Sequence, residues 1–230
     1  MLTIGLLGGM SWESTAEYYR LINHGVRERL GGTHSARMLM LSVDFAEIEA
    51  LQHAGDWDGL GRIMLAEARQ IKSGGADFLV IATNTMHRFA DEVEAEAAIP
   101  VLHIADAMGA AIAAQGFARI GLLGTRFTME QPFLKARLAD RFGITSLVPD
   151  AADRATVHGV IYEELVKGAI RTESREAYRA VMARLAEAGA EAIVLACTEI
   201  MLLVQPGDSA RPLFDTTALH AAAAVERALS

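Results

Sequence analysis

The only cysteine of the chain, Cys197, stands where a thiol can do chemistry. It follows the apolar segment 192–196, which has the composition of a buried strand, and precedes the polar pair Thr198 and Glu199. An isolated free cysteine is more often a small buried hydrophobe than a reagent. In open α/β sheets, however, ligands bind beyond the carboxyl ends of the strands, which is the position predicted for Cys197.

An internal repeat favours the reactive interpretation. The sequence Ile-Gly-Leu-Leu-Gly occurs at 4–8 and again at 120–124, an offset of 116. The segment Gly-Ala-Asp-Phe-Leu-Val-Ile-Ala at 75–82 is matched by Gly-Ala-Glu-Ala-Ile-Val-Leu-Ala at 189–196, an offset of 114. Two blocks in the same order at nearly one offset indicate two copies of one α/β unit.

The repeat gives each residue around Cys197 a counterpart in the first copy. The aligned pairs are Thr83 with Cys197, Asn84 with Thr198, and Thr85 with Glu199. Two similar lobes related by a pseudo-twofold axis would bring these strand ends together across a cleft. The glycine turn after the first strand of each lobe would add backbone N–H groups, which suit a carboxylate.

The elements that must position these residues alternate between strands and helices. Apolar runs at 3–7, 37–43, 78–82, 101–104, 119–123, 146–149, 191–195 and 213–214 are separated by segments with helical spacing. This alternation predicts an α/β protein of two pseudosymmetric lobes, each a mainly parallel sheet flanked by helices. We assign 1–104 plus 206–230 to the first lobe and 105–205 to the second, with the active site in the cleft between them.

The composition excludes several classes of protein. The net charge is −8 and the basic residues are scattered, so no basic patch predicts binding to nucleic acid. One cysteine excludes an intramolecular disulfide and fits a reducing cytoplasm. The apolar run at the N-terminus is too short for a signal peptide, and no segment predicts a membrane span. The histidines show no metal-ligand spacing, so no metal site is expected.

Three motifs in order then reveal a resemblance that spans nearly the whole chain. Residues 8–11 (Gly-Gly-Met-Ser), 83–87 (Thr-Asn-Thr-Met-His) and 189–199, ending in Cys-Thr-Glu, resemble the aspartate/glutamate racemase superfamily. The resemblance is greatest to its branch of amino-acid racemases. It implies an acidic amino acid, aspartate or glutamate, as the small-molecule substrate. It also implies no pyridoxal phosphate or metal, a homodimer, and two acid/base residues on opposite faces of the substrate Cα.

The catalytic pair departs from the usual pattern of this superfamily. Cys197 matches the second catalytic cysteine, whereas Thr83 stands where the motif normally reads Cys-Asn-Thr. A thiol can be ionised near neutral pH, but a threonine hydroxyl is too weakly acidic for that. We therefore expect Cys197 to abstract the α-proton and the Thr83 side to reprotonate the other face. The resemblance implies that this asymmetry favours conversion of L to D.

The same resemblance suggests the substrate contacts. Asn84 and Thr85 are expected to bind the α-carboxylate, although both residue types also cap helices. Glu199 is a partner for the ammonium group, and Thr198 mirrors Asn84. The remaining expected contacts are Met10 and Ser11 through the backbone, Gln52 and Lys167 with the substrate side chain, His87 as an orienting residue, and Arg126 with an anion. For Lys167 and His87, an ordinary helix-end role explains the residue equally well.

Three kinds of alternative stay open at this point. Sister activities on the same scaffold are hydantoin racemisation, malonate decarboxylation and maleate isomerisation. A protein that only binds amino acids would also have two lobes and would not need the missing thiol. A thiol hydrolase would need a Cys/His pair at a recognisable spacing, and the sequence contains none.

Overall fold

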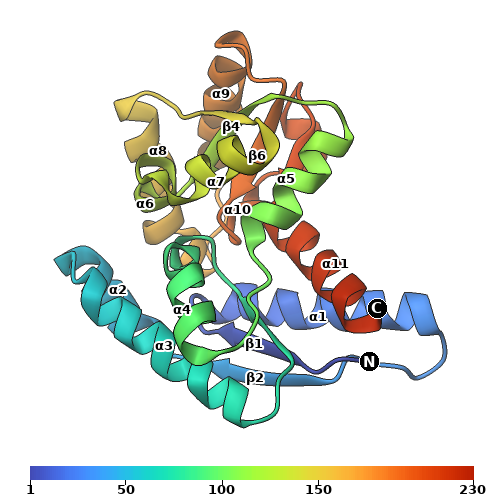
Figure 1. The fold of residues 1–230 in the computed structure, drawn as a ribbon. Helices are drawn as coiled ribbons and strands as arrows, with labels where there is room; N and C mark the ends of the chain where they lie inside the picture. The colour runs from blue at the N-terminus through green and yellow to red at the C-terminus, as the bar shows by residue number, and fades with distance from the viewer. The chain divides into compact units, whose positions relative to one another are not determined.

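The computed structural model describes residues 1–230 as two compact units, each of the α/β class. The first unit contains Met1–His103 and His220–Ser230, and the second contains Ile104–Leu219. Each unit has one parallel sheet with helices around it (Figure 1), which confirms the predicted fold class. None of the helices combines the length and apolar composition that a membrane span requires.

The sheet of the first unit has the order β2-β1-β3, with every pair parallel. Its strands are β1 (Ile4–Gly8), β2 (Met38–Ser42) and β3 (Phe78–Ile81). Its helices are α1 (Trp12–Leu30), α2 (Phe45–Ala54), α3 (Trp57–Ser73), the 3-10 helix η1 (Thr85–Phe89) and α4 (Ala90–Ala97). All residues of β1 and β3 are buried because helices cover both faces of the sheet.

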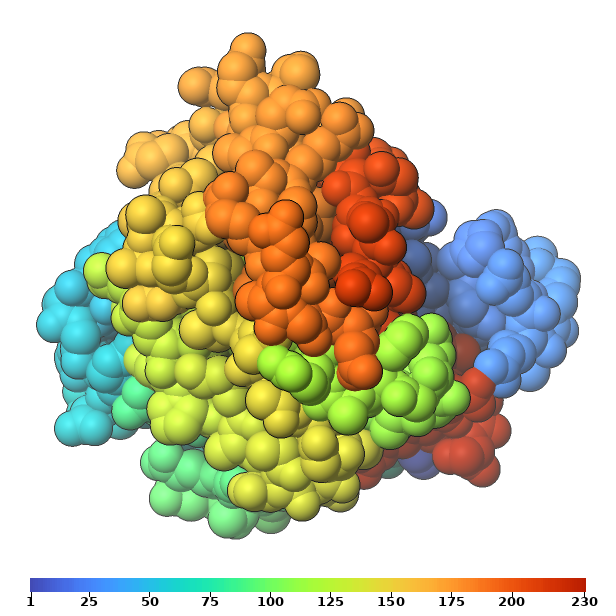
Figure 2. All heavy atoms as spheres, turned by 90° about the horizontal axis from the view of Figure 1, so that it is seen from above, coloured from blue at the N-terminus to red at the C-terminus, as the bar shows by residue number.

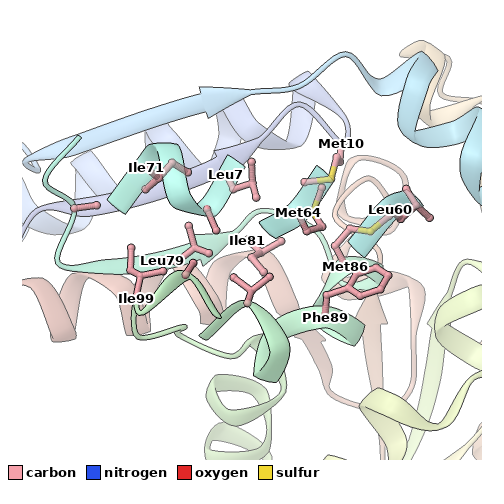
Figure 3. Close-up of a cluster of buried hydrophobic side chains, with 14 of the residues drawn as sticks. Leu7, Met10, Leu60, Met64, Ile71, Leu79, Ile81, Met86, Phe89 and Ile99 are labelled. Carbon is pink, nitrogen blue, oxygen red and sulfur yellow. The ribbon is translucent and has the colours of Figure 1, made fainter. Parts of the chain in front are cut away.

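Alternate residues of β1 point into two different hydrophobic clusters. Ile4 and Leu6 pack with α1 and with the C-terminal helix α11 (Thr216–Leu229). Leu7 on the opposite face packs with side chains from α2, α3, η1 and α4. Figure 3 shows this second cluster, in which the sulfur atoms of three methionines lie among aliphatic side chains.

The sheet of the second unit has the order β5-β4-β6-β7, again with every pair parallel. Its strands are β4 (Arg119–Gly124), β5 (Thr145–Leu147), β6 (Ala192–Ala196) and β7 (Leu213–Asp215). Its larger helices are α5 (Ile104–Ala114), α7 (Pro132–Phe142), α8 (Ala151–Glu163) and α9 (Thr172–Glu187). Short helical segments are α6 (Arg126–Glu130), η2 (Leu165–Lys167), α10 (Ile200–Leu203) and η3 (Pro206–Asp208).

Helices α8 and α9 of the second unit lie against each other. Figure 2 shows α8 in yellow and α9 in orange, side by side. Asp150 caps α8 by accepting the N–H of Asp153, and Asp153 forms an ion pair with Arg184 of α9.

The two sheets have equivalent strand pairings, as the internal repeat predicts. In the first unit Ile4 pairs with Phe78, and in the second Ile120 pairs with Ala192. These are the same alignment positions, so the offsets in the sequence correspond to equivalent places in the two sheets.

Two expectations about the chain are corrected. The predicted strand 101–104 is reduced to one parallel bridge between Val101 and Leu79, because α5 already begins at Ile104. The segment 206–219, which we had assigned to the first lobe, belongs to the second unit. The reason is β7, which adds to the second sheet by pairing with β6.

Candidate active site

Polar residues of the first unit gather just beyond the carboxyl ends of β1 and β3. These strands are neighbours: Leu7 pairs with Ile81, and the N–H of Ala82 donates to the carbonyl of Leu7 at 2.8 Å. The turn that carries Met10 therefore begins beside the turn that carries Thr83, at one edge of one sheet.

The turn after β1 is held by its own hydrogen bonds. Gly9 has a φ of 90°, and its N–H donates to Thr15 Oγ1 at 2.8 Å. The Thr15 hydroxyl donates to the carbonyl of Ser11 at 2.7 Å, and Ser11 caps α1 by accepting the N–H of Ser14. A Cβ at Gly9 would lie 2.2 Å from the carbonyl oxygen of Val43, so glycine is required there.

The side chain of Met10 belongs to the hydrophobic cluster of the first unit rather than to a polar surface. It is 5% exposed and packs with the cluster of Leu60, Met64 and Met86 (Figure 3). The side chain of Met10 is therefore occupied by packing, which leaves its backbone as the part that a ligand could contact.

Thr83 is half-buried, and its two successors are buried. Its N–H donates to the carbonyl of Ile81 at 2.9 Å, which closes a tight turn at the end of β3. Asn84 stands at the start of η1, yet its side chain makes no cap hydrogen bond. The helix-capping explanation for Asn84 is therefore not supported.

A buried histidine lies directly behind Thr83. His87 Nδ1 lies 2.8 Å from the carbonyl oxygen of Thr83. Because a carbonyl only accepts, Nδ1 carries the hydrogen. The His87 ring lies 4.7 Å from the ring of His103 and 5.4 Å from that of His220, measured between centroids.

The last of these histidines is held neutral by its surroundings. Its Nε2–H donates to the carbonyl of Leu102 at 2.8 Å, and its Nδ1 accepts the hydroxyl of Tyr18 at 2.9 Å. Burial, and then the neighbouring His87, lower the pKa of His220 from 6.5 to about 3. His220 is therefore uncharged at neutral pH, and it lies beside the His87 ring that contacts the Thr83 backbone.

Gln52 lies on α2 of the same unit, and its side chain is buried. It is the one expected substrate contact of this unit that does not come from the turns after β1 or β3.

The second unit places Cys197 one residue beyond β6, and the thiol is 9% exposed. The Sγ–H donates to Glu199 Oε2 at 2.9 Å, and the Thr198 hydroxyl donates to the same oxygen at 3.0 Å. Burial, then the charge of Glu199 and its hydrogen bond, raise the pKa of Cys197 well above its usual value. Cys197 therefore rests as a thiol that is hydrogen-bonded to a carboxylate.

A buried phenol lies near this thiol. Tyr178 of α9 donates its hydroxyl to the carbonyl of Val157 at 3.1 Å. Burial, and then the charges of Cys197, Glu164 and Glu199, raise the pKa of Tyr178 well above 10.0. The neighbouring charges that act on Cys197 and Tyr178 are therefore acidic, and they oppose the thiolate form.

The other two candidates of this unit lie on separate elements. Lys167 ends η2, is exposed, and forms an ion pair with Glu163 at 3.3 Å. Arg126 begins α6 immediately after the glycine turn that follows β4, and it too is exposed.

The structure thus groups the sequence-predicted residues into two half-sites. One consists of the backbone of Met10 with Ser11, Thr83, Asn84 and Thr85, and the other of Cys197, Thr198 and Glu199. Sequence reasoning missed the buried contacts of Tyr18, His103 and His220. The only available signal was a histidine on the apolar face of a closing helix, which is normally a packing residue. No group of three or more His, Cys, Asp or Glu side chains is placed to hold a metal ion.

Comparison with known proteins identifies the family of the chain. The family model described as Asp/Glu/Hydantoin racemase matches residues 7–224. The structure of a Yersinia pestis protein described as a candidate Asp/Glu racemase is similar over 100% of both chains, with 50% identity and a TM-score of 0.93. An aspartate racemase homologue from Pyrococcus horikoshii OT3 matches 100% of both chains, with 29% identity and a TM-score of 0.85.

More distant structures share the fold alone. The aspartate racemase of Picrophilus torridus is 20% identical, with a TM-score of 0.76, and the match covers 99% of this chain and 94% of that one. The family match covers nearly the entire chain, including all the residues of both half-sites. The chain therefore belongs to the Asp/Glu/hydantoin racemase family and is an isomerase of the racemase type.

Proposed function

We propose that this racemase acts on aspartate or glutamate without a cofactor, that Cys197 removes the α-proton, and that the Thr83 side returns a proton to the opposite face. One observation carries the proposal: the thiol of Cys197 donates to the carboxylate of Glu199 at 2.9 Å. That contact places a proton acceptor next to the thiol. At the equivalent position, Thr83 has a hydroxyl group in place of a thiol.

The first step is a proton transfer within the Cys197–Glu199 pair. The proton on Sγ passes to Glu199 Oε2, so the pair keeps a single negative charge while the charge moves onto sulfur. This transfer requires no nearby cation, which agrees with the acidic surroundings of the thiol. The thiolate then takes the α-proton, and the electron pair of the Cα–H bond remains on the substrate as a carbanion.

The second step completes the inversion. The carbanion takes a proton on its other face from the Thr83 hydroxyl, directly or through a water molecule. The Thr83 oxygen is reprotonated from solvent, and Glu199 releases its proton to solvent, so no net charge is created. The reverse reaction would require Thr83 to act as the base, and an alcohol ionises too weakly to do that efficiently.

The substrate contacts follow from the two half-sites. Asn84, Thr85 and Thr198 bind the α-carboxylate, together with backbone N–H groups of the Met10–Ser11 turn. Glu199 attracts the ammonium group, and a bound ammonium also favours the thiolate that the first step requires. Gln52 and Lys167 contact the distal carboxylate.

The deciding experiment is solvent-deuterium exchange on each separate enantiomer of aspartate and glutamate, followed by NMR without added cofactor. We expect the α-proton of the L-enantiomer to exchange about 10²-fold faster than that of the D-enantiomer, because only Cys197 is a competent base. Equal exchange rates from both enantiomers would contradict the proposed asymmetry between the two directions. If the α-proton of a hydantoin exchanges and that of neither amino acid does, the substrate is a hydantoin and not an acidic amino acid.

We also propose that the enzyme works as a cytoplasmic homodimer, on the basis of the family resemblance and of a single unpaired cysteine. Sedimentation equilibrium across a range of protein concentrations tests the assembly. A monomer at all concentrations would contradict it.

A further inference from the structure

A hollow on the second unit has the shape and charge of an anion-binding site. It has a volume of about 300 Å³ and lies between α6 and α8, which are in contact (Figure 1). Its polar lining consists of Arg126, Glu130, Arg154 and His158. We propose that this hollow, which we call the α6–α8 pocket, binds a small oxyanion: a phosphate group or a carboxylate.

Positively charged side chains outnumber negatively charged ones in and beside the pocket. Arg154 pairs with Glu130 at 3.1 Å, whereas Arg126 has no acidic partner and only lies over the ring of Phe127. Lys135 stands beside the pocket and donates to the carbonyls of residues 129 and 130. Three cations against one carboxylate is a local excess of positive charge in a chain whose net charge is −8.

The donors of the pocket are held in place before any ligand arrives. The N–H of Arg126 donates to His158 Nδ1 at 3.2 Å, which leaves the imidazole hydrogen on Nε2. The His158 ring packs against Phe127 and Tyr162, at centroid distances of 6.0 and 4.7 Å. Arg154 is anchored through Nε to Glu130 and through Nη1 to the carbonyl of Pro149. Guanidinium groups with donors to spare match the geometry of an oxyanion.

The floor of the pocket is made of small residues on one face of α8. Ala151, Ala155 and Gly159 are spaced four apart, so they lie one above the other along the helix. A Cβ built at Gly159 would meet no atom within 4 Å, so the space above it is open. This size admits a phosphate or a small phosphomonoester and is near the lower end for ligand pockets.

The test is isothermal titration of the purified chain with inorganic phosphate, with a phosphomonoester such as glycerol phosphate, and with acetate, a carboxylate that is not the proposed substrate. We expect saturable binding of one phosphate per chain, and about tenfold weaker binding in Arg126→Gln. Arg62→Gln removes an exposed arginine of α3 and should bind as the unaltered protein does. Comparison of the three titrants tells whether the preferred oxyanion is free phosphate, a phosphate ester or a carboxylate.

A second variant separates loss of the pocket from loss of the fold. Gly159→Leu places a side chain in open space on a helix, so circular dichroism should be unchanged while phosphate binding is lost. The proposal is overturned if the unaltered chain shows no saturable binding of any titrant, or if neither Arg126→Gln nor Gly159→Leu weakens it. Since binding rather than turnover is measured, failure of the proposed racemase mechanism would not change either outcome.

Discussion

The half-sites around Cys197 and Thr83 occupy equivalent places in two copies of one fold, yet different chemistry supports them. Behind Cys197 stands a carboxylate that accepts the thiol hydrogen itself. Behind Thr83 stands the imidazole of His87, which donates to the Thr83 backbone carbonyl. The carboxylate contacts the reacting atom of Cys197, whereas the imidazole contacts only the backbone of Thr83.

The two copies of the fold therefore place residues 83 and 197 at equivalent positions but give them different chemical surroundings. A carboxylate next to a thiol provides a base for deprotonation, although its charge also raises the thiol pKa. The His87 imidazole is bonded to the carbonyl of Thr83, so it holds the turn and does not contact the Thr83 hydroxyl through that bond. The expected asymmetry between the enantiomers therefore comes from these supports as well as from the exchange of cysteine for threonine.

Removal of the thiol should have the largest effect. Cys197→Ser replaces it with a hydroxyl that ionises far less readily, so exchange of the α-proton of the L-enantiomer should fall by about 10⁴-fold. NMR in deuterated solvent measures this rate. A variant that retains exchange within tenfold would show that another residue is the base, and unchanged substrate affinity would separate lost chemistry from lost binding.

Removal of the carboxylate should have the next largest effect. Glu199→Gln eliminates the proton acceptor, so kcat from the L-enantiomer should fall by about 10³-fold. The same change removes the charge that helps to raise the thiol pKa, so Cys197 should ionise at a lower pH. A more easily ionised thiol in a slower enzyme is a combination that simple damage to the site would not produce.

The pH dependence of Cys197 alkylation by iodoacetamide reports the second half of that prediction. Glu92→Gln, which neutralises an exposed carboxylate on α4, serves as the matched control and should change neither quantity. If the alkylation profile of Glu199→Gln coincides with that of the unaltered chain, the contact at 2.9 Å is not the source of the raised pKa.

Insertion of a thiol on the other side should sharpen the comparison further. Thr83→Cys supplies a second ionisable group at the equivalent position, so exchange from the D-enantiomer should rise by about 10²-fold. Thr83→Ser keeps a hydroxyl and should keep the asymmetry. No gain in the D direction would mean that the surroundings of residue 83, rather than its side chain, limit the reverse reaction.

How far the sequence predicts this molecule depends on the distance over which each interaction acts. The two repeated blocks, 4–8 with 120–124 and 75–82 with 189–196, correctly predict the central strands and their register. Cys197 and Glu199 are only two residues apart, so their proximity was evident. The hydrogen bond from the thiol to the Glu199 carboxylate depends on the geometry of the turn, so it could not be predicted from the spacing alone.

Long-range contacts were beyond such reasoning. Tyr18 and His220 are 202 positions apart, and each looked like an ordinary residue of a helix. The division of the chain near residue 220 was missed for the same reason, because the pairing of β7 with β6 cannot be inferred from a short apolar run. At Val101 the sequence predicted a structure that is not formed. The apolar run 101–104 has the composition of a strand, but α5 begins at Ile104, so only one bridge forms.

The smallest expected effect concerns His220, whose ring lies beside that of His87. The pKa of His220 is about 3 in the folded chain and 6.5 in a solvated histidine, so the unfolded chain binds the extra proton between these values. Stability is therefore fully present above pH 6.5 and declines as the pH falls toward 3, by about 1.4 kcal/mol per pH unit from this residue. Urea unfolding at a series of pH values measures the slope.

His220→Phe should be less stable at neutral pH, because Tyr18 and the Leu102 carbonyl lose their partner, but its slope should be shallower by that amount. His34→Gln, which changes an exposed histidine, should retain the full slope. An unchanged slope in His220→Phe would mean that His220 is not the residue that makes the fold sensitive to acid.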